Sequence, residues 1–254
     1  MHPLLSIKEA GALYEQKVYY DEICAHDHRL EQVDRFPWEG FLERLGTFYP
    51  QKGRLLDVGS GTGYFLNLAK SKGWEVFGID NSSFANNYSR QKYNLNIING
   101  SLLEVNLAPG SFEVITLWNV LEHLNDPLAA INKIRGLLKD NGIFAFSVPN
   151  MDSFEARFFG KNWAVLRPKE KGHMYYFTPY AIDYILDTTG FRIEYLYSWG
   201  GFGLRSHLLG KDTQARGKSF ILERIALLAR SLVSRLKKGG ILIAVARKTG
   251  DAKL

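Results

Sequence analysis

The stretch Leu55-Leu56-Asp57-Val58-Gly59-Ser60-Gly61-Thr62-Gly63 determines how the rest of the chain is interpreted. A short apolar run reaches an acidic residue and then a Gly-x-Gly-x-Gly turn, after which an amphipathic segment begins. Glycine adopts backbone angles that other residues avoid, and it lets a ligand approach the main chain closely. A helix that begins at such a turn also presents unpaired N–H groups. The stretch therefore predicts a strand, a ligand-binding turn and a helix in a doubly wound sheet.

Beyond this turn, short apolar runs alternate with amphipathic segments, which is the pattern of βαβ units around a parallel sheet. Seven runs are predicted to be strands: 53–58, 74–79, 95–98, 112–118, 142–148, 191–197 and 241–247. Helices are predicted near 62–72, 82–92, 127–139 and 178–188. The last helix is expected to begin with Thr178 as N-cap and Pro179 at its first position. The predicted fold class is α/β, a Rossmann-like, doubly wound, seven-stranded and mostly parallel sheet with helices on both faces.

Four regions are expected along the chain: an N-terminal helical cap over 1–50, a Rossmann-like cofactor-binding core over 51–200, a basic amphipathic helical insertion over 201–240, and the last strand and tail over 241–254. In the insertion, a helix near 219–237 would carry apolar residues on one arc and Arg and Lys on the other. Three roles stay open for it: packing on the domain, peripheral membrane contact through 219–238, or pairing with a partner chain.

Charge and cysteine content limit the location and the partners of the chain. The net charge of +6 is concentrated in residues 201–254, which carry +9 while residues 1–200 carry −3. No nucleic-acid partner is expected, because the body of the protein is slightly acidic. Cys24 is the single cysteine, and neither a signal peptide nor a membrane span is recognisable. The expected location is cytoplasmic, with a peripheral position at the inner membrane surface left open.

The glycine spacing argues against a dinucleotide cofactor. A dinucleotide fingerprint requires Gly-x-Gly-x-x-Gly, but the sixth position is Tyr64 when counted from Gly59 and Leu66 when counted from Gly61. The second predicted strand leads to Asp80, whose carboxylate can accept hydrogen bonds from both ribose hydroxyls of several adenosine cofactors. The residues alone therefore disfavour a dinucleotide without selecting one adenosine cofactor.

Three separated segments resemble the class I S-adenosylmethionine-dependent methyltransferases, especially the branch of the ubiquinone-biosynthesis O-methyltransferases. They are LLDVGSGTGYFL at 55–66, VFGID at 76–80 and LWNVLEHLNDP at 117–127; SVPN at 147–150 and HMYYFT at 173–178 also fit that branch. The resemblance implies S-adenosyl-L-methionine as cofactor. It assigns to the cofactor site Asp57, Gly59, Ser60, Gly61, Gly63, Asp80, Asn81, Ser101, Leu102, Trp118 and Asn119.

Within this resemblance, the loop near Ser101 departs from the family pattern. Many relatives have an acidic residue there that accepts the adenine amino group, whereas this chain has Ser101 followed by Leu102. A hydroxyl is a neutral and weaker acceptor. Leu102 is expected to pack on the adenine ring.

A hydroxyl acceptor must lose its proton when it is methylated, and histidine is the side chain best suited to take it. His123 follows the fourth predicted strand and His173 precedes Thr178, so both are proposed as catalytic residues, with structural hydrogen bonding as the alternative. No metal site is predicted: His26 and His28 would face different sides of a helix. Glu122 and His123 together lack a second pair of ligands.

The aromatic residues of the N-terminal region have two interpretations. Tyr14, Tyr19, Tyr20 and Trp38 could form a lid over the cofactor or belong to the core. In the segment that follows the fifth predicted strand, Trp163 and Arg167 are candidate acceptor contacts.

The predicted function is S-adenosylmethionine-dependent methylation of a hydroxyl in a small-molecule, lipid-linked or glycan acceptor. Two alternatives are kept: a non-catalytic S-adenosylmethionine-binding protein, and a methyltransferase that acts on nitrogen or carbon. The sequence gives neither the acceptor nor the oligomeric state.

Overall fold

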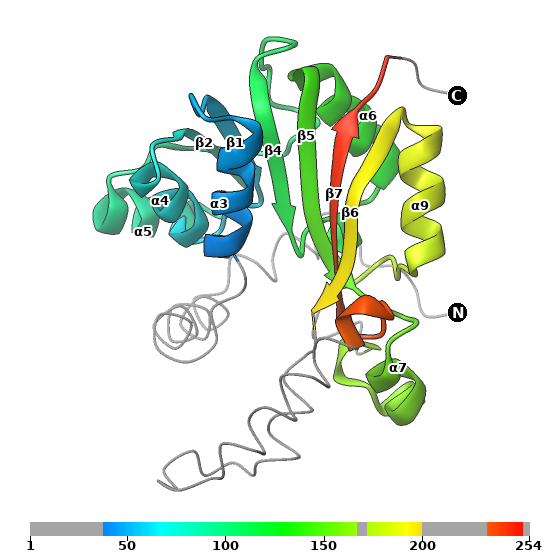
Figure 1. Cartoon of the computed structure of the whole chain (residues 1–254). Helices are drawn as coiled ribbons and strands as arrows, with labels where there is room; N and C mark the ends of the chain where they lie inside the picture. The colour runs from blue at the N-terminus through cyan, green and yellow to red at the C-terminus, as the bar shows by residue number, and fades with distance from the viewer. Residues whose placement is uncertain (1–37, 167–171, 200–232, 251–254) are drawn as a thin grey trace, which may run out of the picture.

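The structure, a computed structural model, describes residues 38–166, 172–199 and 233–250. Its centre is one seven-stranded sheet with the strand order β3-β2-β1-β4-β5-β7-β6 (Figure 1). The strands are β1 (Arg54–Val58), β2 (Glu75–Asp80), β3 (Ile97–Asn99), β4 (Phe112–Trp118), β5 (Leu138–Pro149), β6 (Phe191–Trp199) and β7 (Ile241–Lys248). The pairs β1–β2, β1–β4, β2–β3 and β4–β5 are parallel, whereas β7 lies antiparallel between β5 and β6. The predicted mostly parallel, doubly wound sheet is confirmed.

Helices cover both faces of this sheet (Figure 1). One face carries α3 (Trp38–Phe48) and α4 (Tyr64–Ser71), with α5 (Ser83–Tyr93) beside α4; the other carries α6 (Pro127–Leu137) and α9 (Pro179–Thr188). The expected cap of the last helix is present, because the Thr178 hydroxyl accepts a hydrogen bond from the Ala181 N–H at 3.2 Å and Pro179 is the first helical residue. Each predicted helix in the described part of the core therefore forms close to its expected bounds.

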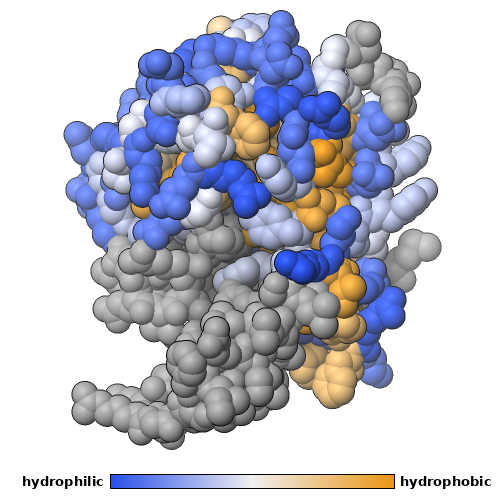
Figure 2. All heavy atoms as spheres, in the orientation of Figure 1, coloured by the Kyte–Doolittle hydropathy of each residue, from blue (hydrophilic) through white to orange (hydrophobic). Residues whose placement is uncertain are grey.

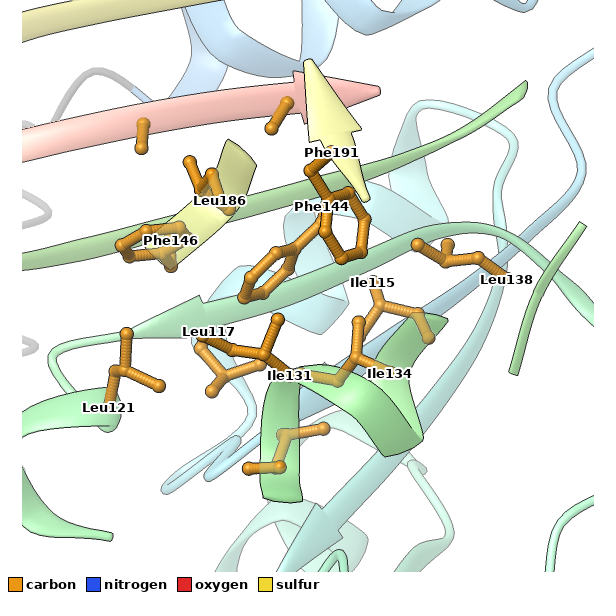
Figure 3. Close-up of a cluster of buried hydrophobic side chains, with 14 of the residues drawn as sticks. Ile115, Leu117, Leu121, Ile131, Ile134, Leu138, Phe144, Phe146, Leu186 and Phe191 are labelled. Atoms are coloured by element: carbon orange, nitrogen blue, oxygen red, sulfur yellow. The ribbon is translucent and has the colours of Figure 1, made fainter. Parts of the chain in front are cut away.

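The core is divided into two layers because alternate residues of a strand point to opposite faces. On the α6 and α9 side, Ile115 and Leu117 of β4 and Phe144 and Phe146 of β5 are completely buried (Figure 3). Val114, Ile143 and Ala145 from the same strands are buried on the side of α3 and α4. Both faces of the central strands are thus packed, which explains why these strands are almost continuously apolar.

Other elements differ from the expected pattern. β5 begins at Leu138, earlier than the predicted 142, and a short helix α7 (Phe154–Phe159) that the sequence did not predict follows it. Within 201–240 the structure describes only residues 233–240, and most of the predicted N-terminal cap, residues 1–37, also lies outside the described residues. In the described part of the chain, no helix is long and apolar enough to cross a lipid bilayer.

Candidate functional site

The candidate site lies where the strand order changes direction. β1 is followed in the chain by β2 and β3 on one side, whereas β4 and β5 continue the sheet on the other side. In open α/β sheets, ligands bind outside the carboxyl ends of the strands at such a switch point. Gly59 comes directly after β1 and Asn119 directly after β4, so these two turns flank the position.

The turn after β1 is held by the neighbouring strand. The N–H groups of Gly59 and Ser60 both donate to the carbonyl of Ile79, at 2.8 and 3.2 Å. Gly59, Gly61 and Gly63 all have positive φ angles, of 70°, 51° and 80°. Such angles are strained for residues that carry a Cβ atom. The glycine pattern is therefore a requirement of the backbone of this turn.

The space around two of these glycines differs. A Cβ atom on Gly59 would lie 2.4 Å from a methyl carbon of Val120, so the turn after β1 packs closely on the turn after β4. A Cβ atom on Gly61 would meet no atom within 4 Å. Gly61 therefore borders open space at the switch point, whereas Gly59 fixes the distance between the two turns.

Asp80, at the end of β2, faces the glycine turn. Its two carboxylate oxygens accept hydrogen bonds from the N–H groups of Gly61 at 2.7 Å and Ser82 at 2.8 Å. Burial raises the pKa of the Asp80 carboxyl, although these two hydrogen bonds oppose the shift. A carboxylate offers about four acceptor positions, so Asp80 keeps capacity for a pair of neighbouring hydroxyls.

Asp57, the acidic residue of the glycine stretch, is deeply buried. Its side chain is 2% exposed, and it accepts a hydrogen bond from the Thr116 hydroxyl at 2.6 Å. Burial raises its pKa to about 8, which the Thr116 hydrogen bond opposes and the nearby Asp80 charge reinforces. Asp57 thus joins β1 to β4 below the turn. Thr116 was missed by sequence reasoning, although a polar residue in the middle of an apolar strand is a usable signal.

The turn after β4 is held in a similar way. Asn119 has a positive φ of 54°, and its N–H donates to the carbonyl and the hydroxyl of Ser147 on β5. The Ser147 hydroxyl in turn donates to the Asn119 side-chain oxygen at 3.2 Å. This pairing stabilises a left-handed conformation that asparagine tolerates better than most residues. Ser147 is therefore a supporting residue of the turn; its SVPN segment was noted in the sequence, but Ser147 itself was given no role.

Trp118, the last residue of β4, lies in an aromatic cluster with α3 and α4. Its ring centroid is 5.0 Å from that of Phe41 and 5.3 Å from that of Phe65. Trp38 lies against Tyr64 and Phe65, at 5.7 and 5.8 Å. Of the aromatic residues suggested as a lid, Trp38 is thus part of a packed cluster next to the glycine turn; the three tyrosines lie outside the described residues.

The loop after β3 reaches the same edge of the sheet. The Gly100 N–H donates to the Asp80 carbonyl at 3.1 Å, which brings Ser101 near the end of β2. The Ser101 hydroxyl accepts a hydrogen bond from the Leu103 N–H at 3.4 Å. The Leu102 side chain is 4% exposed and belongs to the main hydrophobic cluster. Asn81, the remaining predicted cofactor residue, is exposed beside Asp80.

Beyond the turn after β4, three ionisable side chains come together. Glu122 and His123 lie in the short helix η1 (Leu121–His123), and His173 lies in the segment before α9. Their ligand-type atoms are all within 4.8 Å of one another, and the two imidazole centroids are 4.7 Å apart. The N–H groups of Met174 and Tyr175 donate to the Glu122 carbonyl at 2.8 and 3.1 Å. The chain thus returns to the site after about 50 residues.

Backbone carbonyls determine which imidazole nitrogens carry hydrogen. The Nδ1 atom of His123 lies 3.2 Å from the Gly172 carbonyl, and that of His173 lies 3.1 Å from the Val165 carbonyl. A carbonyl only accepts, so both Nδ1 atoms donate, and each neutral ring has its lone pair on Nε2. Both histidines are therefore arranged to accept a proton, or to ligate a cation, through Nε2.

Glu122 gives this cluster its unusual electrostatics. Its side chain is completely buried, and no other described residue donates a hydrogen bond to either carboxyl oxygen. Burial raises its pKa to about 8. One carboxyl oxygen lies 4.0 Å from the Nε2 atom of His123. A buried acid whose only hydrogen-bond donor among the described residues is its own backbone N–H is costly, so it indicates a site in which a proton or a cation is handled.

Other candidates from the sequence do not join this cluster. Trp163 is 6% exposed and packed, while Arg167, Cys24, His26 and His28 lie outside the described residues. The main residue that sequence reasoning left out of the proposed site is Glu122, because its burial cannot be read from the residues alone.

The residues at the switch point fit S-adenosylmethionine. Gly61 borders open space, and Asp80 retains acceptor capacity toward ribose hydroxyls. The Ser60 hydroxyl is buried and receives no hydrogen bond from the described residues. Asp57, Ser101 and Asn119 lie on the surrounding turns, so the predicted cofactor residues gather at one edge of the sheet.

Comparison with known proteins gives the same assignment. A family described as the methyltransferase domain matches residues 29–196, more than half of the chain. A ubiquinone biosynthesis O-methyltransferase of Cereibacter sphaeroides is 33% identical over 152 residues, which are 57% of this chain and 61% of that protein. The Bacillus subtilis protein YqeM, which is named as a methyltransferase, is 27% identical over 51% of this chain and 52% of its own length. The chain thus spans about half the length of the curated relatives it matches.

Solved structures show the same fold at lower sequence identity. An S-adenosylmethionine-dependent methyltransferase of Thermotoga maritima superposes with a TM-score of 0.62 at 18% identity, over 95% of this chain and all of that one. The 1,6-didemethyltoxoflavin-N1-methyltransferase of Burkholderia thailandensis, solved with S-adenosylhomocysteine, gives 0.58 at 17% identity over 98% and 93%. The chain therefore belongs to the methyltransferase domain family, in the class I fold that uses S-adenosylmethionine as its cofactor.

Proposed function

We propose that the protein transfers a methyl group from S-adenosylmethionine to a hydroxyl of a small-molecule, lipid-linked or glycan acceptor. The observation that carries this proposal is the cluster of Glu122, His123 and His173 next to the turn after β4. Val120 joins the two halves of the site, because it packs on Gly59 and directly precedes the helix that bears Glu122 and His123. A proton acceptor beside the cofactor turn is what a hydroxyl acceptor requires, whereas an amine that is already deprotonated attacks through its lone pair without one.

The cofactor side of the site performs binding and orientation. When bound, S-adenosylmethionine supplies an electrophilic methyl group, whose bond to sulfur breaks as the bond to the acceptor oxygen forms. Asp80 would hold the ribose hydroxyls, while the glycine turn lets the cofactor approach the backbone. Fixing two reactants in line accounts for much of the rate of such a displacement.

The acceptor side performs the proton transfer. The acceptor hydroxyl gives its proton to Nε2 of His123 or His173, whose Nδ1 atoms are already committed to backbone carbonyls. A positive charge on His123 favours the ionised form of the Glu122 carboxyl, 4.0 Å away, and that carboxylate in turn stabilises the imidazolium. Acceptor binding would also exclude water from the partly exposed His123 side chain and so strengthen this interaction.

The cofactor part of the proposal is tested by isothermal titration of the full chain with S-adenosylhomocysteine, with NADH as the control ligand. We expect low-micromolar binding of S-adenosylhomocysteine and none of NADH. Absence of S-adenosylhomocysteine binding would refute the methyltransferase proposal and would make Ser101 the first position to examine.

The acceptor part is tested by transfer of a labelled methyl group to a panel of hydroxyl and amine acceptors. The expected result is labelling of a hydroxyl acceptor that is lost in His123→Gln or in His173→Gln, whichever ring takes the proton, and that is unaffected by a chelator. Activity that disappears with a chelator and returns with a divalent cation would replace proton transfer by a metal-assisted mechanism. Tight cofactor binding without transfer to either class would support the non-catalytic alternative.

A further inference from the structure

A group of large apolar side chains is exposed on α7 and on the segment that precedes β7. It consists of Phe154, Phe158 and Phe159 of α7 together with Leu236, and we call it the α7 patch. Phe158 is 84% exposed and Leu236 is 53% exposed. Figure 2 shows the hydrophobic surface over α7 with hydrophilic side chains beside it. Single exposed apolar residues are common, but several together mark an interaction surface.

The α7 patch is held firmly on the domain. The Phe154 N–H donates to the Lys238 carbonyl at 3.0 Å, so α7 begins against the segment that precedes β7. The Asn150 side chain donates to the carbonyls of Lys237 and Gly239 at 2.9 and 2.8 Å. The ring centroids of Phe158 and Phe159 are 5.0 Å apart in a T-shaped arrangement. The exposed rings therefore project from a fixed base that joins the end of β5 to the start of β7.

Basic residues surround the α7 patch. The described stretches 152–161 and 233–240 carry Arg157, Lys161, Arg235, Lys237 and Lys238 against Asp152 and Glu155, a net charge of +3. Asp152 is already paired with both Arg157 and Lys238, which lower the pKa of its carboxyl. Burial raises the pKa of Glu155. The charge that remains around the exposed rings is therefore positive.

A second group of exposed aromatic residues provides a contrast. Tyr180 and Tyr184 of α9 are 78% and 63% exposed, but Asp183 and Asp187 share their helix. Aromatic rings among basic residues fit an anionic lipid surface, into which the rings insert while the cations contact the headgroups. Aromatic rings among acidic residues do not fit such a surface.

We propose that the α7 patch and its basic border bind the surface of a membrane that contains anionic lipids. The sequence between β6 and residue 233 adds six Lys/Arg against two Asp/Glu. The described residues on either side of that segment lie next to each other, because the Ser198 hydroxyl donates to the Val233 carbonyl at 3.2 Å. α7 follows the carboxyl end of β5, the same edge of the sheet that carries the candidate site. If the proposed function holds, membrane binding would bring a lipid-linked acceptor to that edge.

The test is co-sedimentation of the full chain with vesicles of phosphatidylcholine alone and with vesicles that also contain phosphatidylglycerol. We expect binding to the anionic vesicles only, weakened by salt. Phe158→Ser should reduce the partition coefficient about tenfold, and Lys161→Glu about fivefold or more. Tyr180→Ser, the matched exposed aromatic on α9, should bind like the wild-type protein.

The proposal would be overturned by no vesicle binding, by equal binding to both vesicle types, or by equal binding of Phe158→Ser and the wild-type protein. Dimerisation without lipid that Phe158→Ser abolishes would also overturn it, by assigning the patch to a second copy of the chain. S-adenosylhomocysteine titration of Phe158→Ser separates this proposal from the proposed function. Its cofactor affinity should be unchanged, and a failure of methyl transfer in every variant would leave the vesicle result intact.

Discussion

The two halves of the candidate site are built in different ways. The cofactor half, around Gly59, Gly61 and Asp80, consists largely of backbone groups and of one carboxylate that fixes them. The acceptor half, around Glu122, His123 and His173, consists of side chains, two of whose orientations are fixed by backbone carbonyls of a distant segment. The residues of the cofactor half lie within about 25 positions of one another in the sequence. The acceptor half is complete only because the segment before α9, which carries His173, comes back to lie beside Glu122 and His123. Cofactor binding and acceptor chemistry should therefore respond separately to substitution.

The largest expected effect comes from the acceptor half. Replacing His123 or His173 with Gln removes the Nε2 lone pair of that ring, and the methyl-transfer rate should fall about 10²- to 10³-fold in the variant that lacks the proton acceptor. The affinity for S-adenosylhomocysteine should stay within about twofold of the wild-type value, because His173 is not part of the glycine turn. The measurements are single-turnover kinetics and isothermal titration of the same preparation.

Tyr175→Phe is the matched control for His173→Gln, since Tyr175 lies two residues from His173 and its hydroxyl donates to the backbone carbonyl of Asn125. It should retain nearly full activity. A parallel loss of cofactor affinity in His173→Gln would show that the two halves are not separate.

The next effect belongs to the cofactor half. Asp80→Ala removes the acceptor expected for the ribose hydroxyls, so S-adenosylhomocysteine should bind about 30-fold more weakly or worse. Asp80→Asn keeps one acceptor oxygen, so its affinity for S-adenosylhomocysteine should fall less than that of Asp80→Ala. Because Asp80 also accepts from Gly61 and Ser82, thermal unfolding must be recorded for each variant. Unchanged affinity in a folded Asp80→Ala protein would exclude Asp80 from the cofactor site.

A smaller effect should distinguish two glycines of the same turn. Gly59→Ala places a Cβ atom 2.4 Å from Val120 at a positive φ, and should lower the free energy of unfolding by about 2–3 kcal/mol. The Cβ atom of Gly61→Ala would meet no atom within 4 Å. This variant should therefore lose only about 1 kcal/mol of the free energy of unfolding, the ordinary penalty of a left-handed backbone conformation.

The affinity of Gly61→Ala for S-adenosylhomocysteine should nevertheless fall, because the new methyl group occupies the space that the cofactor needs. Chemical denaturation and titration together separate the two effects. Equal unfolding free energies for the two variants would contradict the close packing of Gly59 on Val120.

The smallest predicted effect concerns the adenine end of the cofactor half. Ser101→Asp supplies the charged acceptor that the family resemblance implies at this loop, and should strengthen S-adenosylhomocysteine binding about three- to fivefold. The gain should be absent with an analogue that lacks the adenine amino group. Weaker binding by Ser101→Asp would indicate that the adenine approaches this loop in another way.

Much of the fold was predictable because its signals are local. The apolar runs that became β1, β2 and β4 differ from their predicted bounds by at most a residue at either end. Thr178 and Pro179 marked the start of α9 correctly. The helix α7 was not predicted, since it is short and exposes the phenylalanines that a sequence pattern would place in a core.

By itself, the sequence determined the strand and turn order, the glycine turn and the carboxylate at the end of β2, because hydrophobic periodicity and glycine backbone preferences act within a few residues. It also identified His123 and His173 individually. Only the tertiary structure decided that these two imidazoles lie 4.7 Å apart and that Glu122 is buried beside them. Such proximity depends on where the chain returns after β5, and burial depends on every element packed around a residue. Neither quantity is a property of neighbours in the sequence.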